Sequence, residues 1–377
     1  MNNSGPLKNK LQSTLDKAGV IINGPNSWDP QIHDNRFYSK VIAHGSLGLG
    51  EAYMDGWFDI KEPEEFFYRI FRAELDKTIN PMTIALPYLR SLLINEQNRI
   101  RGRDSIRKHY NLSPELYMSF LDKYNQYTCC YFPDGNETLE EASIKKLQLI
   151  CKKLQLCPTD KVLDIGCGWG GFAKFASENY GCHVTGVSIS EEQISYAREF
   201  AKGLPVEFIY ADYRDIKGSY DKILICGMIE HVGYKNYRHI MQVVSKCLKS
   251  DGIFLLHTIG RNESITYGDP WIHKYIFPNA VLPSMKQLAA ATEGLFVMED
   301  CHNFGPSYYH TLMAWHKNFV NNWQQLAKAH PGYDERFYRM WTYYLLCCAA
   351  AFKARKNQLW QIVFTKKGKT GGYTSYR

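Results

Sequence analysis

Short apolar runs alternate with amphipathic segments through the middle of the chain. The apolar runs predict buried strands at 161–165, 183–188, 206–210, 220–227 and 252–259. Apolar residues at helical spacing predict helices after several of these runs, at 172–176, 191–202 and 237–249. Because predicted strands and helices alternate, we expect an α/β fold with a mostly parallel sheet wrapped by helices.

The part before this alternation has a different pattern. Residues 1–95 are predicted to form a small helical domain, because the apolar and aromatic positions from residue 11 onward follow helical spacing. Within it, residues 45–51 are too rich in glycine for a helix, and we expect a turn-rich connection there. Residues 96–110 are polar and basic, which predicts a linker between this domain and a catalytic domain at 111–377.

The pattern becomes helical again near the C-terminus. The stretch 269–279 is aromatic and interrupted by proline, and we expect it to be too irregular for a core element. Long helical patterns follow at 308–329 and 334–354, and 358–364 is predicted as a last strand.

Composition changes this picture little. The 377 residues include 45 basic and 38 acidic side chains, and this mild positive charge suits an anionic membrane surface, nucleic acid or simple solubility equally. Eleven cysteines without a C-x-x-C pair predict reduced thiols and no zinc or other metal site. No signal segment and no run of about 18 apolar residues is present, so we expect a cytoplasmic protein that touches membranes only from the side.

A glycine-rich turn directly follows the first predicted strand of the sheet. Gly166, Gly168 and Gly170 allow a close approach of backbone to a ligand, and Asp164 offers a carboxylate to a cationic group. The order of acid and glycines resembles the S-adenosylmethionine loop of class I methyltransferases. Gly171 also completes a dinucleotide fingerprint, so a nicotinamide or flavin site is the alternative.

Polar residues after the second and third strands are candidates for cofactor contacts. Ser188, Ser190 and Gln193 occupy the place where many nucleotide sites have a ribose-binding acid, although Ser190 also has the features of a helix N-cap. Tyr213 and Arg214 can frame an adenine ring or form a solvated turn.

Two further polar residues stand at the ends of the fourth and fifth strands. Glu230 follows one strand, and His257 interrupts the apolar end of the next, where burial requires a partner. Tyr127, Thr128 and Cys129 precede the sheet; this segment is either a lid over the cofactor or ordinary aromatic packing.

Together, these motifs resemble the cyclopropane-fatty-acid-phospholipid synthases over nearly the whole chain. The matching stretches are 45–50, 53–57, 127–129, 167–171, 230–233, 256–260, 269–272, 275–278, 303–305 and 337–345. The resemblance implies a class I S-adenosylmethionine methyltransferase fold, Rossmann-like, with a seven-stranded mostly parallel sheet and a smaller helical N-terminal domain. It also implies a homodimer.

The resemblance implies that a methyl group passes from S-adenosylmethionine to a cis double bond in a phospholipid acyl chain, leaving S-adenosylhomocysteine, before the ring closes. A bicarbonate ion is the implied base, held by the residues that match Cys129, Glu230, His257, Ile259 and Tyr308. Tyr309 is the alternative to Tyr308, and Cys348 matches a further position regarded as catalytic. The cofactor set is Tyr127, Thr128, Asp164, Gly166, Cys167, Gly168, Trp169, Gly170, Ser188, Ser190, Gln193, Tyr213 and Arg214.

These residue types suit such chemistry. An alkene is a weak nucleophile and must be held in line with the sulfonium methyl, away from water, and aromatic faces such as Trp169 can stabilise the cation that forms. The alternatives are a related methyltransferase that stops at a methyl branch or modifies a different lipid, and a methyltransferase that acts on RNA; the basic residues show no nucleic-acid recognition motif.

The expected partner is a bilayer containing unsaturated acyl chains, met at the inner face of the membrane. The N-terminal domain and the basic residues between Arg99 and Lys108 are candidates for docking there, or the linker is simply solvated.

Overall fold

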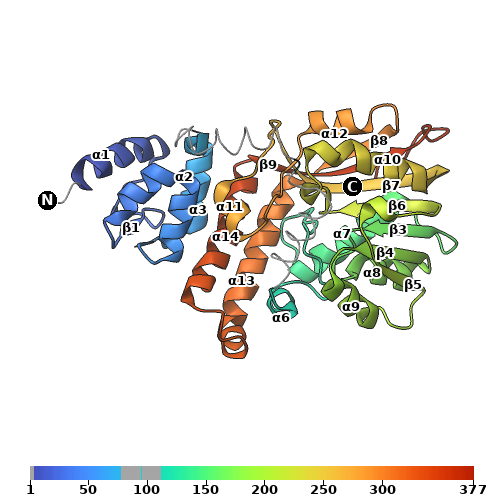
Figure 1. Cartoon of the computed structure of the whole chain (residues 1–377), viewed down its shortest axis with the longest axis horizontal. Helices are drawn as coiled ribbons and strands as arrows, with labels where there is room; N and C mark the ends of the chain where they lie inside the picture. The colour runs from blue at the N-terminus through green and yellow to red at the C-terminus, as the bar shows by residue number, and fades with distance from the viewer. Residues whose placement is uncertain (1–3, 78–94, 96–111) are drawn as a thin grey trace. The chain divides into compact units, whose positions relative to one another are not determined.

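The computed structural model describes residues 4–77, 95 and 112–377, and the chain divides into two compact units (Figure 1). The first contains residues 1–94, 267–278 and 312–356, and the second contains 95–266, 279–311 and 357–377. Two stretches of the predicted catalytic domain therefore group with the N-terminal residues. The predicted basic linker, 96–110, lies outside the described residues.

The second unit is built on a seven-stranded sheet. Its strands are β3 (Lys161–Ile165), β4 (His183–Ser188), β5 (Val206–Tyr210), β6 (Tyr220–Cys226), β7 (Leu248–Arg261), β8 (Val297–Asn303) and β9 (Asn357–Thr365). They lie in the order β5-β4-β3-β6-β7-β9-β8, with β3 to β7 parallel and β9 antiparallel to both of its neighbours. The predicted α/β class with a mostly parallel sheet is confirmed.

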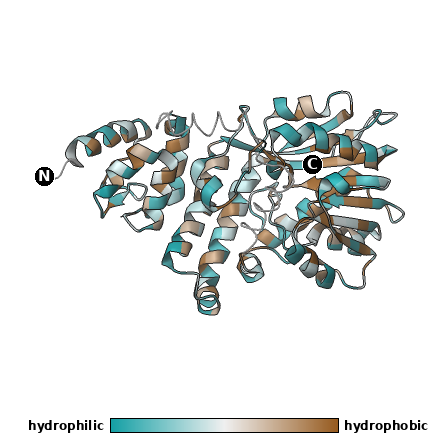
Figure 2. Cartoon of the chain, viewed as in Figure 1, coloured by the Kyte–Doolittle hydropathy of each residue, from teal (hydrophilic) through white to brown (hydrophobic). Residues whose placement is uncertain are grey.

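Helices cover both faces of this sheet because successive strand residues point to opposite sides. The helices are α6 (Pro114–Met118), α7 (Leu139–Leu154), α8 (Gly171–Tyr180), α9 (Glu191–Phe200), α10 (Tyr237–Cys247), α12 (Met285–Thr292) and the start of α13 (Gly305–Ala329). Leu163 and Ile223 belong to a core with α10 and α12, whereas Val162 and Leu224 belong to a core with α7, α8 and α9. Figure 2 shows hydrophobic residues concentrated along these central strands.

The strand order reverses between β3 and β6, since the chain first moves outward through β4 and β5 and then returns. Loops that leave the carboxyl ends of strands at such a point commonly bind ligands. Here the loops after β3 and β6 lie side by side: a Cβ placed on Gly166 would lie 2.7 Å from the Met228 side chain. The fold thus brings the glycine turn next to the segment that carries Glu230.

The first unit is helical, with a small two-stranded antiparallel sheet. It contains α1 (Ser4–Leu15), α2 (Arg36–Met54), α3 (Pro63–Arg72), α11 (Pro270–Tyr275), the later part of α13, α14 (Glu335–Lys353), β1 (Gln31–Ile32) and β2 (Phe58–Asp59). Its core is aromatic: the buried Tyr343 ring lies 4.9 Å from Phe67 and 4.4 Å from Trp271 between ring centroids.

Two predictions for this unit are wrong. Residues 45–51 lie within α2, which is kinked only at Gly45 (φ 54°, ψ −128°). Their glycines serve close packing, because a Cβ on Gly50 would lie 2.3 Å from the Trp271 indole. That indole belongs to the stretch 269–279, which also contains a core element: Asp269 caps α11, and Trp271 is only 1% exposed.

The sheet also differs in detail from the pattern. β8 was not predicted from periodicity, because this edge strand is polar and largely exposed. β7 begins at Leu248, within the predicted helix 237–249. Among the described residues, no helix is long and apolar enough to cross a membrane.

Candidate functional site

The glycine turn occupies the five residues between β3 and α8. Gly166, Gly168 and Gly170 all have positive φ angles, 84°, 53° and 84°, which favour glycine. Packing adds a second requirement at Gly170, where a Cβ would lie 2.8 Å from the Ala197 side chain. A Cβ on Gly168 would meet no atom within 4 Å. The backbone at Gly168 is therefore open to a ligand.

Asp164 lies one residue before the end of β3 and is only 2% exposed. Burial raises the pKa of its carboxyl to about 7, and the positive charge of Lys146 opposes that rise. A bound cation favours the ionised carboxylate, whereas the phosphates of a dinucleotide disfavour it. The buried acid thus fits the sulfonium cofactor better than the dinucleotide alternative.

Ser188, Ser190 and Gln193 form one buried cluster. Ser190 Oγ accepts a hydrogen bond from Gln193 N at 3.3 Å, which is the predicted N-cap of α9, and Ser188 Oγ donates to Gln193 Oε1 at 3.0 Å. The N-cap is confirmed. Contact of these residues with a cofactor stays a prediction.

The turn after β5 is stabilised by contacts among its own residues. Arg214 Nη1 donates to both carboxylate oxygens of Asp212 at 3.0 Å, and its guanidinium lies 4.5 Å from the Tyr213 ring centroid. Tyr213 is 6% exposed, and burial raises its pKa to about 12. The adenine-binding role of Tyr213 and Arg214 stays a prediction.

Glu230 is held by the end of the neighbouring strand. Its Oε1 accepts hydrogen bonds from Thr258 Oγ1 at 2.9 Å and from the Ile259 backbone N–H at 2.7 Å. Its Oε2 is buried and has no hydrogen-bond partner in the described part of the chain. Ile259, a predicted site residue, therefore acts on Glu230 through its backbone, and Thr258 is a partner that the sequence did not single out.

His257 lies on β7 opposite Cys226 of β6 and is 1% exposed. Gln361 Nε2 lies 3.2 Å from Nδ1, and with the amide donating there, the imidazole proton resides on Nε2. Burial lowers the pKa of His257 well below its usual value, and Lys146 and Lys153 lower it further, so the ring is neutral. Gln361 was missed, although a glutamine inside the apolar run of β9 is a signal for a buried partner.

The free atoms of Glu230 and His257 are complementary. Within the described residues, His257 Nε2 is also buried without a partner, so β7 carries a free donor opposite the end of β6, and the turn after β6 carries a free acceptor. Leaving a buried polar group unsatisfied costs roughly 1–3 kcal/mol. Each group therefore leaves one polar atom for a ligand: His257 a donor and Glu230 an acceptor.

The segment that carries Cys129 is attached to the start of α13. Cys130 N donates to Thr311 Oγ1 at 3.0 Å, and Phe132 N donates to Ser307 Oγ at 3.2 Å. The same turns of α13 carry Tyr308, which is 8% exposed. The fold thus brings the predicted residues Cys129 and Tyr308 onto elements that are hydrogen-bonded to each other.

The thiol of Cys129 is buried and engaged. It donates to the Cys130 carbonyl at 3.1 Å, and burial raises its pKa well above the usual value. Cys348 lies on α14, in the first unit, and burial raises the pKa of its thiol to about 12. Both thiols are protonated near neutral pH, which argues against nucleophilic roles.

Aromatic rings connect the predicted lid with the glycine turn. The ring centroid of Tyr117 lies 5.2 Å from that of Tyr127 and 5.6 Å from that of Trp169. Trp169 also contacts Tyr196 at 5.4 Å and is 2% exposed. Tyr127 and Trp169 are therefore brought into one aromatic cluster at the cofactor loop.

Comparison with known proteins agrees with this geometry. Residues 97–362 match the mycolic acid cyclopropane synthetase family. The chain is 46% identical to the cyclopropane-fatty-acyl-phospholipid synthase of Escherichia coli K12 over 358 residues, which cover 95% of this chain and 93% of that protein. A probable fatty acid methyltransferase of Pseudomonas putida is 35% identical over 70% of this chain and 69% of its own length.

Solved structures give the same assignment. A cyclopropane synthase of Mycobacterium tuberculosis superposes with a TM-score of 0.65 at 26% identity, covering 70% of this chain and 98% of its own. A mycolic acid cyclopropane synthase solved with S-adenosylhomocysteine also gives 0.65, at 28% identity over the same shares. The chain therefore belongs to the mycolic acid cyclopropane synthetase family of S-adenosylmethionine-dependent methyltransferases.

Proposed function

We propose that this enzyme is a cyclopropane-fatty-acyl-phospholipid synthase, which adds a methylene to the cis double bond of unsaturated acyl chains in membrane phospholipids. The similarity to the Escherichia coli enzyme supports the substrate class. The observation that carries the ring-closing step is the complementary pair of buried free atoms, Glu230 Oε2 and His257 Nε2. Methyl transfer to an alkene leaves a carbocation, and the ring closes when this cation loses a proton of the added methyl group, so the site must offer a proton acceptor.

S-adenosylmethionine, when bound, supplies an electrophilic methyl group on a sulfonium. The open backbone at Gly168 and the buried carboxylate of Asp164 are the parts of the chain that would hold it. The aromatic cluster of Tyr117, Tyr127 and Trp169 excludes water from this side of the site. In the overall reaction the C–S bond, the π bond of the alkene and one C–H bond of the methyl group break, two C–C bonds form, and the proton of that C–H bond leaves to a base.

We propose bicarbonate as the acceptor of that proton. Glu230 Oε2 would accept the O–H of the ion, and the neutral His257 would donate from Nε2 to one of its anionic oxygens. The positive charge of Lys146, which acts on His257, favours an anion in this region. Cys129 and Tyr308 complete the proposed set, while Ile259 contributes by fixing Glu230.

Incubation with S-adenosylmethionine and vesicles of a monounsaturated phospholipid tests the activity. We expect acyl chains heavier by one methylene that have lost the double bond. A product of the same mass that carries a methyl branch and keeps a double bond would instead indicate a fatty acid methyltransferase, and an unchanged chain would refute the proposal. Removing dissolved carbon dioxide should lower the rate of cyclopropane formation, and added bicarbonate should restore it. An unaffected rate would exclude bicarbonate as the base and leave the proposed synthase activity standing.

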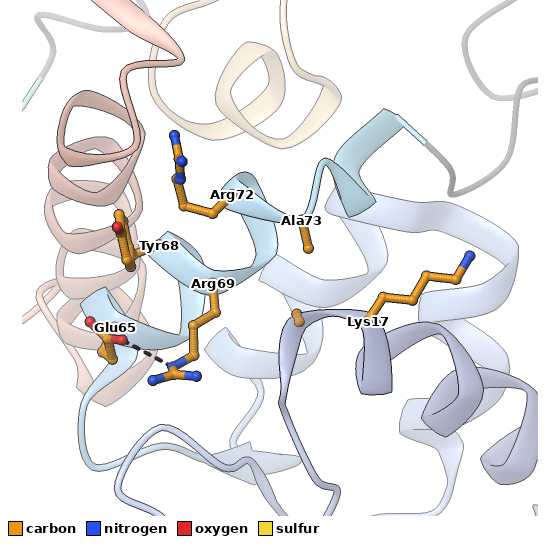
Figure 3. A pocket seen from close by; sticks show the side chains of 7 residues that line it. Lys17, Glu65, Tyr68, Arg69, Arg72 and Ala73 are labelled. Carbon is orange, nitrogen blue, oxygen red and sulfur yellow. Dashed lines mark ion pairs between the residues drawn. The ribbon is translucent and has the colours of Figure 1, made fainter.

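We also propose that the first unit docks on the membrane and that a hollow in it receives a phospholipid phosphate. The hollow has a volume of about 400 Å³ (Figure 3) and is lined by Lys17, Ala18, Glu65, Tyr68, Arg69, Arg72 and Ala73. Arg69 pairs with Glu65 at 2.9 Å. Lys17 and Arg72 form no ion pair with any described residue, so their charges are available to an anion.

We also propose that residues Arg99 to Lys108, outside the described part, add to binding at the inner face of the membrane. We expect Cys348→Ala to retain activity. Lost activity in this variant would instead indicate a role of Cys348 in turnover.

We propose that the protein forms a homodimer, which would appear as twice the mass of one chain in sedimentation analysis.

A further inference from the structure

Helix α7 carries two lysines whose side chains are both fully buried, Lys146 and Lys153. Lys153 is paired with a carboxylate, since its Nζ lies 3.7 Å from Asp300 Oδ2. In the described part of the chain, Lys146 has no such pair: its Nζ donates to Gln126 Oε1 and, at 3.0 Å, to Thr128 Oγ1, both neutral. Burying a charge without an opposite charge is unfavourable, so stability alone does not explain Lys146.

The two acceptors of Lys146 flank Tyr127 in the predicted lid. Thr128 in turn packs against the loop after β6, because a Cβ on Gly227 would lie 2.6 Å from its methyl group. The ammonium therefore ties the segment 126–128 to α7, at the edge of the sheet where the cofactor loop begins.

Asp164 lies on the face of β3 that packs against α7, since Val162, two residues earlier on the strand, belongs to the core that α7 shares with the sheet. Lys146 is the charge that opposes the effect of burial on the Asp164 pKa, and Lys153 does not act on it. Among the described residues, the other titratable groups that interact with Asp164 are the thiols of Cys167 in the glycine turn and Cys226 on β6, and burial raises the pKa of both. Because these thiols stay protonated and uncharged, the charge that acts on the Asp164 carboxyl is that of Lys146.

We propose that Lys146 is a positioning residue of the cofactor site: it anchors the segment 126–128 and places a fixed positive charge within range of Asp164, which keeps the carboxylate available to a sulfonium. This inference rests on the proposed function only in requiring that Asp164 faces S-adenosylmethionine.

Calorimetric binding of S-adenosylmethionine, measured across the pH range around neutrality, tests the charge. Affinity should fall as Asp164 becomes protonated, and in Lys146→Met and Lys146→Gln the midpoint of this fall should move to higher pH. A shift of one pH unit lowers the affinity about tenfold below the midpoint. Lys146→Arg should restore the midpoint of the unaltered enzyme.

Lys153→Met is the matched control, because it removes an equally buried lysine from the same helix. It should lower the melting temperature without moving the midpoint. Three outcomes would each overturn the proposal and leave Lys146 a structural residue. The midpoint could stay unmoved in both neutral Lys146 variants, it could shift equally in Lys153→Met, or both neutral variants could fail to fold.

Hydrogen exchange of the backbone amides separately tests whether Lys146 anchors the segment 126–128. Amides of residues 126–130 should exchange faster in Lys146→Met than in Lys146→Gln, since glutamine can still donate to Thr128. Equal protection in the two variants would overturn the anchoring role. Lipid products are measured in the same preparations: an unaltered enzyme that makes no cyclopropane would refute the proposed function without affecting these binding and exchange results.

Discussion

At the scale of single residues, the site is organised around side chains that are only half satisfied. Glu230 uses one oxygen for Thr258 and Ile259 and leaves the other buried and free, while His257 uses one nitrogen for Gln361. These contacts orient the two side chains, and Glu230 Oε2 and His257 Nε2 have no hydrogen-bond partner among the described residues. Catalytic groups are commonly held in this way, because fixed neighbours prevent them from turning toward other partners.

Replacing Glu230 by glutamine should separate catalysis from stability. Glu230→Gln keeps an oxygen for Thr258 and Ile259 but loses the anionic acceptor, so we expect turnover to fall by about 100-fold or more. Affinity for S-adenosylmethionine should remain near that of the unaltered enzyme. A collapse of cofactor binding, measured by calorimetry, would instead make Glu230 a cofactor or structural residue.

The same substitution should not destabilise the fold above pH 6. Burial raises the pKa of Glu230 from 4.5 to about 6, so the folded state holds its proton longer than the unfolded chain. Stability from this group therefore falls as pH rises from 4.5 to about 6, by about 2 kcal/mol. Glu230→Gln lacks this loss and should melt no lower than the unaltered enzyme at pH 8; a markedly lower melting temperature would contradict the electrostatic argument.

Turnover should depend on pH through the same carboxyl. Because Oε1 already accepts two hydrogen bonds, a proton on Glu230 resides on Oε2 and turns this acceptor into a donor, so the rate at saturating S-adenosylmethionine should decline as pH falls below about 6. Saturation is needed because we expect protonation of Asp164, whose pKa is about 7, to weaken cofactor binding separately. A rate at saturation that stays constant well below pH 6 would show that Glu230 is not needed in its ionised form.

At the scale of elements, close contacts between helices decide where glycine is required. α2 and α11 approach each other at Gly50, where any side chain would enter the Trp271 indole. This contact joins elements that are far apart in the sequence but belong to the same unit. It explains why a glycine-rich segment is helical here and why an irregular aromatic stretch belongs to the core.

Gly50→Ala should therefore destabilise the first unit, although alanine is the better helix former. A Cβ 2.3 Å from the indole forces the helices apart, and we expect a loss of about 1–3 kcal/mol in the free energy of unfolding. Gly5→Ala in α1 is the control, because a Cβ there meets no atom within 4 Å, and it should be neutral or slightly stabilising. Equal effects in chemical denaturation would contradict the packing argument.

At the scale of the whole molecule, the first unit is assembled from three separate stretches of chain. The Trp271 segment and α14 reach the N-terminal helices from within the predicted catalytic domain, so this unit is not an independent N-terminal appendage. Docking variants are therefore better made as surface substitutions in the complete chain than as truncations.

Removing the unpaired charges of the hollow should weaken membrane binding. Lys17→Gln and Arg72→Gln should each lower affinity for anionic phospholipid vesicles about fivefold, as expected for about 1 kcal/mol per charge near a membrane surface. Lys61→Gln, an exposed lysine that does not line the hollow, is the matched control. If all three variants lose affinity equally in vesicle flotation, the effect is one of net charge and the hollow has no specific role.

Much of the fold was predictable because it depends on neighbours in the sequence. The apolar runs of β3 to β6 and the glycine turn are local patterns, and Ser190 caps α9 through a residue three positions away. β8 was not predictable in this way, because an exposed edge strand is held by pairing with β9 and has little hydrophobic periodicity of its own.

For the site, the sequence by itself determined the cofactor loop and suggested Glu230 and His257 as polar residues at strand ends. Only the tertiary structure decided how these groups are held, because their partners are distant in the chain: Gln361 lies 104 residues after His257. Likewise, Lys146 looked like any helical lysine, and only folding removed it from water and placed it within range of Asp164. Burial and long-range contacts set the charge and orientation of a side chain, and neither is encoded by its immediate neighbours.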